Sequence, residues 1–278
     1  MNYIQVNLKI SPQHPWKDVI TQELSTIGFE SFVDDDKDLQ AFVSEENFDQ
    51  NKLTSLLREY IDQGVEIEYK KLTIPSQNWN ASWEESYQPV KVDQALLIRA
   101  PFHEKDESFD LQIEIQPQMS FGTGHHQTTY LLCKTFLDID FKGKKVLDVG
   151  TGTGVLGILA SLLGANTILG TDIEQGAVEN AKENCERNNI TNFTILEGDI
   201  EVVKEQNFDI IIANINKNVL MSHLKSYAKL IANKGILLLS GFFENDIPSL
   251  VEAAKENNFE LAEEITLENW AVLKFNKN

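Results

Sequence analysis

The chain has 278 residues, which is enough for one large domain or for a small domain followed by a medium-sized one. With 42% hydrophobic and 24% charged residues and no apolar run of membrane-spanning length, the sequence predicts a globular protein of the cytoplasm without a membrane partner. Its net charge of −19 disfavours nucleic acid as a direct partner, and its two cysteines, Cys133 and Cys185, fall within expected helices as buried thiols.

Residues 1–72 predict a small α+β domain. Four segments read as strands, and two have the apolar spacing of amphipathic helices. In chain order, these are a strand at 3–10, a helix at 15–28, strands at 29–35 and 39–45, a helix at 48–64 and a strand at 65–72. This order is that of a ferredoxin-like domain. Because the segment contains no cluster of catalytic residue types, we expect it to recognise a substrate.

Residues 73–89 predict a linker. A short helix is expected between Pro75 and Pro89, and Trp79 and Trp83 share one of its faces because they lie four residues apart. We expect the two tryptophans to pack on a neighbouring domain rather than to bind substrate.

Residues 90–278 predict a larger second domain. It begins with a pair of strands around a polar turn within 90–117, and from Thr128 onward helices and strands alternate. Helices are expected at 128–139, 154–164, 175–188, 217–233 and 246–257, and strands at 144–150, 166–173, 193–199, 208–215, 234–242, 259–267 and 270–276. Apolar strands separated by helices indicate a parallel sheet covered on both faces. The predicted fold class is therefore α/β: a doubly wound, Rossmann-like sheet of seven strands, the last two antiparallel, after a ferredoxin-like α+β domain.

A glycine loop follows the first strand of this sheet, in the sequence VLDVGTGTGVLG. Gly150, Gly152 and Gly154 would let a ligand approach the backbone closely. A G-x-G-x-x-G pattern starts at Gly152, but it begins two residues after the strand ends, and Asp148 would repel a pyrophosphate, so NAD fits poorly. S-adenosylmethionine carries no phosphate and has a sulfonium and an ammonium group, and an acidic strand end suits such a cation.

Polar residues also end the next three strands, where a doubly wound sheet binds its ligand. Asp172 is placed to accept hydrogen bonds from two ribose hydroxyls, and Asp199 is at the height of an adenine, with a helix or turn cap as its alternative role. Asn214 could accept N–H bonds from an amine and aim its lone pair at a methyl group, or it could simply form a turn. A lysine acceptor must first lose its proton, which costs roughly 4–5 kcal/mol at pH 7, and no side chain is an obvious base.

The stretch MSFGTGHHQTT at 119–129 could be a metal site, a phosphate loop, a catalytic histidine cluster or a flap over a ligand. Two adjacent histidines at a helix start point about 100° apart and cannot easily share a metal ion, so we expect no metal. We interpret the stretch as a flap in which Phe121 and the glycines cover the ligand. Thr128 or Thr129 is expected to cap the next helix, and His126 to donate a hydrogen bond to the loop backbone.

Three motifs together resemble the ribosomal protein L11 methyltransferase (PrmA) family. They are MSFGTGHHQTT, VLDVGTGTGVLGILA with GTDIEQGAVENAKEN, and ANI at Asn214. The glycine motif alone is typical of all class I methyltransferases, whereas the flap stretch is specific to this family. The resemblance covers the whole chain, because the family also has an N-terminal ferredoxin-like domain that binds the protein substrate and a connecting helix.

The resemblance implies transfer of methyl groups from S-adenosylmethionine to lysine ε-amines and the N-terminal α-amine of ribosomal protein L11, in its free form rather than on the assembled ribosome. It also places Thr123 in the covering loop and Thr129 among the cofactor contacts. With the residues considered above, the expected cofactor-binding set is Phe121, Thr123, Thr129, Gly150, Gly152, Asp172, Asp199 and Asn214. Asn214 is the expected catalytic residue.

The sequence departs from the family pattern at two places. Where the family usually has Thr-His-Pro-Thr-Thr, residues 125–129 are His-His-Gln-Thr-Thr, and the loss of the proline changes the stiffness of the loop. Where the family often has Asn-Ile-Leu-Ala, residues 214–217 are Asn-Ile-Asn-Lys, which alters the rim of the acceptor site. The alternatives are a methyltransferase for another protein, RNA or a small molecule, and a non-catalytic module that keeps the cofactor pocket.

Overall fold

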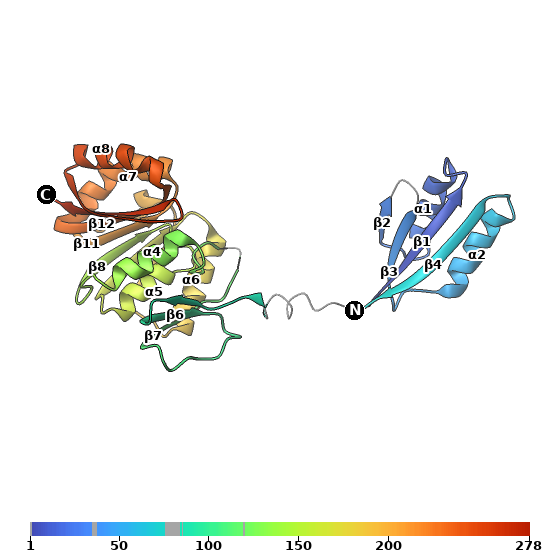
Figure 1. The fold of residues 1–278 in the computed structure, drawn as a ribbon, viewed down its shortest axis with the longest axis horizontal. Coiled ribbons are helices and arrows are strands. Elements are labelled where there is room, and N and C mark those ends of the chain that lie inside the picture. Colours follow the sequence, from blue (N-terminus) through green and yellow to red (C-terminus); the bar gives the residue numbers. More distant parts are fainter. Residues whose placement is uncertain (1, 35–37, 76–83, 85, 119) are drawn as a thin grey trace. The chain divides into compact units, whose positions relative to one another are not determined.

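The computed structural model describes residues 2–34, 38–75, 84, 86–118 and 120–278. The chain divides into two compact units, Met1–Ser86 and Tyr87–Asn278. Figure 1 shows both as ribbons coloured along the chain. The tryptophans of the predicted linker, Trp79 and Trp83, lie outside the described residues.

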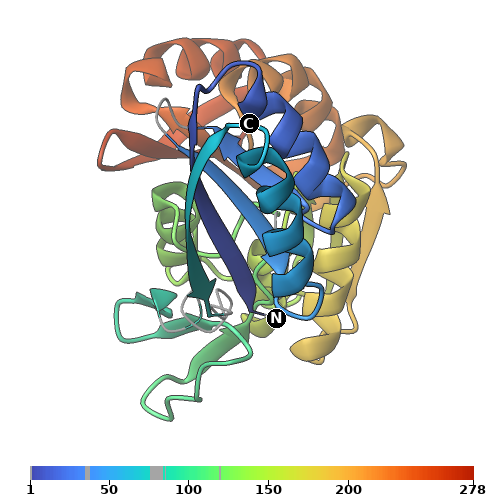
Figure 2. The same ribbon diagram turned by 90° about the vertical axis from the view of Figure 1, so that its right-hand side faces the viewer.

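The first unit is one antiparallel sheet with two helices. Its elements are β1 (Tyr3–Ser11), α1 (Trp16–Thr26), β2 (Ser31–Asp34), β3 (Leu39–Ser44), α2 (Gln50–Ile61) and β4 (Glu66–Ile74). The sheet order β2-β3-β1-β4 confirms the predicted ferredoxin-like arrangement. Both helices cover the same face (Figure 2), because alternate residues of β1, such as Val6 and Leu8, pack with Leu24 of α1 and Leu53 of α2.

The second unit opens with a small sheet of three strands, β5 (Val90–Val92), β6 (Leu96–Arg99) and β7 (Leu111–Glu114). The prediction of a strand pair is wrong in number, and β6 and β7, which flank the polar turn, run parallel to each other. Val92, Ile98 and Ile113 are buried in the core of the larger unit, which explains why this segment belongs to it.

The main sheet of the second unit has seven strands. Its strands are β8 (Lys145–Val149), β9 (Thr167–Asp172), β10 (Phe193–Glu197), β11 (Phe208–Asn214), β12 (Ile231–Phe243), β13 (Phe259–Leu267) and β14 (Trp270–Lys277). The helices are α4 (Gln127–Phe136), α5 (Val155–Leu162), α6 (Gln175–Arg187), α7 (Lys217–Leu230) and α8 (Ile247–Glu256), with short 3-10 turns at Ile200–Val202 and Glu244–Asp246. The order β10-β9-β8-β11-β12-β14-β13 confirms the predicted doubly wound sheet. The last two strands pair antiparallel as expected, but only β14 runs against the other strands, because β13 beyond it runs in their direction again.

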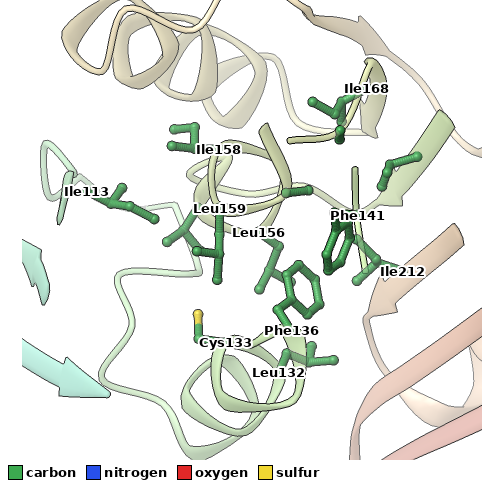
Figure 3. Close-up of a cluster of buried hydrophobic side chains, with 14 of the residues drawn as sticks. Ile113, Leu132, Cys133, Phe136, Phe141, Leu156, Ile158, Leu159, Ile168 and Ile212 are labelled. Carbon is green, nitrogen blue, oxygen red and sulfur yellow. The ribbon is translucent and has the colours of Figure 1, made fainter. Parts of the chain in front are cut away.

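Apolar cores lie on both faces of this sheet. One core contains side chains from α4, α5 and α6, and the other contains side chains from α7 and α8. In Figure 3, Phe136 and Cys133 of α4 face Leu156 and Leu159 of α5. A sheet buried on both faces leaves its strand ends as the place where polar side chains can reach a ligand.

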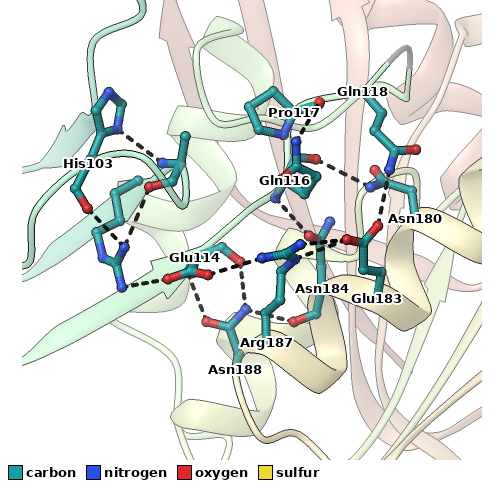
Figure 4. Close-up of polar contacts among 12 residues, drawn as sticks. His103, Glu114, Gln116, Pro117, Gln118, Asn180, Glu183, Asn184, Arg187 and Asn188 are labelled. Atoms are coloured by element: carbon teal, nitrogen blue, oxygen red, sulfur yellow. Dashed lines mark hydrogen bonds and ion pairs between the residues drawn. The ribbon is translucent and has the colours of Figure 1, made fainter. Parts of the chain in front are cut away.

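A row of asparagines on α6 anchors the segment that leads to the flap (Figure 4). Asn188 exchanges two hydrogen bonds with the backbone of Glu114, at 2.8 and 2.7 Å. Asn184 accepts from the Gln116 amide at 2.8 Å, and Asn180 donates to the Gln116 carbonyl at 3.2 Å. Because these asparagines are four residues apart, their amides pair with the edge of the segment that faces away from β6.

The described residues contain neither a membrane-spanning helix nor a metal-binding cluster. In that part of the chain, no helix is long and apolar enough to cross a membrane. Among the same residues, no group of three or more His, Cys, Asp or Glu side chains is placed to hold a metal ion.

Candidate functional site

The glycine loop connects β8 to α5 through left-handed backbone. Gly150, Gly152 and Gly154 have φ values of 73°, 55° and 81°. A Cβ atom at Gly152 would overlap the carbonyl oxygen of Phe121, and one at Gly150 would overlap the side chain of Ile215. Glycine is therefore required here both by conformation and by the close approach of two neighbouring segments.

The flap is fastened to this loop by one threonine. The Thr153 amide donates to the Phe121 carbonyl at 2.9 Å, and the Thr153 hydroxyl donates to the Gly122 carbonyl at 2.6 Å. Asn184 in turn donates to the Thr153 carbonyl at 2.9 Å. The flap, the glycine loop and α6 are thus joined through hydrogen bonds of Thr153.

The helix after the flap is capped by His126, not by a threonine as predicted. The His126 Nδ1 atom accepts from the Thr128 amide at 3.2 Å, so this side chain is an acceptor rather than the expected donor. Burial lowers the pKa of His126, which favours the neutral ring that an accepting nitrogen requires. Thr128 and Thr129 are instead fully buried in the first turn of α4.

A cavity of about 260 Å³ lies at the carboxyl ends of β8, β9, β10 and β11. Most of the predicted set lines it, namely Phe121, Gly150, Gly152, Asp172, Asp199 and Asn214. The other two do not. Thr123 Oγ1 lies 3.2 Å from His125 Nδ1 within the flap, and Thr129 Oγ1 accepts from the Asn214 amide nitrogen at 3.4 Å.

The cavity wall is acidic. Asp172, Glu174 and Asp199 line it, and the described lining residues include no lysine or arginine. The Asp172 carboxylate accepts from the Gly152 amide at 2.9 Å and from the Glu174 amide at 3.1 Å, so its direction is set by the backbone. Such a wall favours a ligand that is cationic and carries no phosphate.

Asp148, which suggested a cation site in the sequence, does not line the cavity. Its side chain is 1% exposed and accepts from the Thr151 hydroxyl at 2.6 Å. Burial, with a contribution from the nearby charge of Asp172, raises the pKa of Asp148 to about 6. The residue supports the loop from beneath and is not a direct ligand contact in this geometry.

Asn214 lies between this cavity and a second one of about 250 Å³. Its amide nitrogen donates to Thr129 Oγ1 at 3.4 Å. Its Oδ1 atom is buried and has no hydrogen-bond partner among the described residues. A buried, unpaired acceptor is costly unless a ligand completes it, so Asn214 marks the point where a donor is expected to bind.

The aromatic rings of Phe121, His126 and Trp270 line the second cavity, and of these sequence reasoning missed Trp270. Trp270 packs on His126 with ring centroids 4.6 Å apart and on Phe243 at 4.2 Å, and His126 packs on Phe121 at 5.1 Å. Trp270 is the first residue of β14, which runs antiparallel to β12 and so begins at the carboxyl edge of the sheet. This strand topology, rather than any local motif, could have indicated from the sequence that Trp270 lies near the site.

The residues that depart from the family pattern have structural partners. Gln127 donates to Glu268 at 2.6 Å. Asn216 caps α7 by accepting from the Val219 amide, and Lys217 pairs with Asp246 at 2.7 Å. The rim of the second cavity is therefore held by polar contacts that these substitutions supply.

Comparison with known proteins agrees with this geometry. Residues 13–278 match the family model described as ribosomal protein L11 methyltransferase (PrmA). Proteins of that name from Porphyromonas gingivalis and Phocaeicola vulgatus are 39% and 37% identical, covering 93% and 99% of this chain and 90% and 99% of their own lengths. The crystal structure of a ribosomal protein L11 methylase from Lactobacillus delbrueckii subsp. bulgaricus aligns with a TM-score of 0.64 and 27% identity, over 69% of this chain and 100% of that one. The chain therefore belongs to the ribosomal protein L11 methyltransferase family.

Proposed function

We propose that this protein transfers methyl groups from S-adenosylmethionine to amino groups of ribosomal protein L11. The observation that carries the proposal is the position of Asn214, whose unpaired Oδ1 lies where an acidic cavity meets an aromatic one. A reaction between a cationic donor and an amine needs two adjoining sites of this kind.

S-adenosylmethionine is the methyl donor of this family, and its sulfonium supplies an electrophilic methyl group. The acidic cavity fits this cofactor. Gly150 and Gly152 would leave room for it against the backbone, and Asp172, whose carboxylate is held by the Gly152 amide, would accept hydrogen bonds from ribose hydroxyls. Asp199, which follows β10 and lines the cavity, would lie beside the adenine. The absence of lysine and arginine from the described lining argues against a phosphate-bearing dinucleotide.

The aromatic cavity fits the acceptor amine. Asn214 Oδ1 can accept an N–H bond and so point the lone pair of the nitrogen toward the methyl group, which makes catalysis mainly a matter of positioning. Trp270 and Phe121 would surround the carbon chain of a lysine. Removal from water favours the neutral amine, because desolvation disfavours the charged form.

Lysine ε-amines and the N-terminal α-amine of free L11, in the cytoplasm, are the acceptors we propose. In this division of labour, residues 1–72 recognise L11, 73–89 link the units and 90–278 catalyse. The open face of the first sheet supports the recognition role, because Tyr3, Leu72 and Ile74 are 39%, 51% and 38% exposed and lie on neighbouring strands.

The catalytic proposal is tested with Asn214→Ala, assayed with free L11 and with methylated sites resolved by mass spectrometry. We expect kcat to fall by about 10²-fold, because a positioning contact is lost, while affinity for S-adenosylhomocysteine in calorimetry falls less. Asn218→Ala, an exposed asparagine on α7, is the control and is expected to be unaffected. Wild-type kcat for Asn214→Ala would contradict the role, and methyl incorporation into RNA instead of L11 would favour the alternative substrate class.

The recognition proposal is tested with Leu72→Ser. We expect a higher KM for L11 and an unchanged affinity for S-adenosylhomocysteine, because only the open sheet face is altered. Ile61→Ser is the matched control, since Ile61 is 45% exposed in the same unit but lies on α2. Equal KM values for Leu72→Ser and the wild type would show that this face does not bind L11.

A further inference from the structure

Two buried side chains of α7 form a chain of polar contacts that ends at the acidic cavity. His223 Nε2 lies 3.2 Å from Asp199 Oδ1, and the Tyr227 hydroxyl lies 3.4 Å from His223 Nδ1. Tyr227 is 0% exposed and His223 is 8% exposed, whereas both His223 and Asp199 line the cavity. Nothing in the proposed reaction has yet used His223 or Tyr227.

When the His223 ring is neutral, the contacts from Tyr227 through His223 to Asp199 allow only one arrangement of donors and acceptors. Burial raises the pKa of Tyr227, so its hydroxyl keeps its proton and donates to His223 Nδ1. The proton of the ring is then on Nε2, which donates to Asp199 Oδ1.

Asp199 Oδ1 also accepts a second hydrogen bond. The Ile200 amide also donates to Oδ1, as the cap of a 3-10 turn. Oδ1 therefore has two donors, and Oδ2 has no hydrogen-bond partner among the described residues. The capping role and the ligand role considered for Asp199 are compatible, because each uses a different oxygen.

We infer that His223, oriented by Tyr227, is a positioning residue that fixes the Asp199 carboxylate so that Oδ2 accepts a hydrogen bond from the exocyclic amine of an adenine. This inference rests on the proposed use of S-adenosylmethionine. Selectivity for a 6-amino purine then depends on the orientation of the Asp199 carboxylate. A carboxylate that rotates freely must be ordered on binding, which reduces the free energy gained from its hydrogen bond to the amine.

The test compares two ligands that differ only in the 6-amino group. Calorimetry on the full chain measures the affinities of S-adenosylhomocysteine and of its analogue in which hydrogen replaces this amine. We expect the wild type to prefer the amino compound by about tenfold or more, which is the range of a hydrogen bond to a charged acceptor. The ratio of the two affinities is the readout, since a general loss of packing lowers both affinities together.

His223→Leu is expected to reduce the ratio to about threefold or less, by loss of the contact that orients the carboxylate. His223→Gln is expected to restore most of it, because the glutamine amide can donate from a similar position. Lys225→Leu, at an exposed position of the same helix, is the control and should keep the wild-type ratio. In an Asp199→Ala background, His223→Leu should have no further effect on the ratio.

The outcomes separate this inference from the proposed function. An unchanged ratio in His223→Leu, or an equal reduction by His223→Leu with and without Asp199, would overturn the positioning role. If His223→Leu does not fold, Tyr227→Phe replaces it. That variant removes one hydroxyl and is expected to lower the ratio about threefold, and an unchanged ratio would again overturn the inference. A wild-type chain that binds neither compound would instead overturn the use of S-adenosylmethionine.

Discussion

The buried carboxyl group of Asp148 is expected to make the folded protein less stable as the pH rises. Its pKa is raised from 3.8 to about 6. Between these values the folded chain holds a proton that the unfolded chain has released, so the free energy of unfolding falls with increasing pH. The resulting penalty is about 1.6 kcal/mol at pH 5 and about 3 kcal/mol at pH 7.5.

Asp148→Asn removes this titration while keeping an oxygen that can accept from the Thr151 hydroxyl. The variant should therefore gain about 1.4 kcal/mol relative to the wild type between pH 5 and pH 7.5. Urea unfolding of the full chain at both values measures the gain, and the change with pH is independent of how well the amide packs. Asp138→Asn, at an exposed position, removes the same formal charge as a control. A difference between Asp148→Asn and the wild type that stays constant from pH 5 to pH 7.5 would refute the reasoning.

Three further outcomes are expected for the site. Gly152→Ala and its control Gly143→Ala both place alanine in left-handed backbone, at a cost of about 1–2 kcal/mol each. Only the alanine at position 152 meets the Phe121 carbonyl, so only Gly152→Ala should weaken S-adenosylhomocysteine binding in calorimetry, by about tenfold or more. Equal losses of affinity in the two variants would contradict this. Asp172→Ala should weaken the same binding by about 1.5–3 kcal/mol, and unchanged affinity would remove Asp172 from the ribose site. Trp270→Ala should lower methyl transfer to L11 far more than cofactor affinity, and the reverse pattern would move the acceptor site elsewhere.

The architecture was predictable because the composition of its strands indicates which of their faces are buried. The strand that ends at Asn214 is apolar at nearly every position, which is possible only when both faces of a sheet are covered. The short sheet at 90–114 was not predictable, because β6 and β7 are parallel without a helix between them and no local pattern distinguishes that pairing from a hairpin. The strand β12 begins at Ile231, before the Asn-Lys-Gly sequence that indicates a turn. The strand continues through this sequence, with Lys234 at a positive φ of 62°.

The lining of the cavity was predictable where a motif or a strand end marks it. Asp172 and Asn214 follow directly from the topology of a doubly wound sheet. His223 and Trp270 come from elements whose local sequence shows only an amphipathic helix and an edge strand. The role of Asp148 was misread because its position at a strand end does not reveal that its side chain points into the packed layer beneath the loop.

The two native cysteines have a practical consequence for studies of motion. Cys133 and Cys185 are 0% and 5% exposed, and burial raises the pKa of each thiol to about 12, so almost no reactive thiolate is present at neutral pH. A maleimide dye should therefore leave the natural chain unlabelled. Cysteines introduced at the exposed positions Ser55 and Lys255, one in each unit, would then be the only labelled sites. Fluorescence energy transfer between them would follow the distance between the units as L11 is added, in a protein whose own cysteines need no replacement.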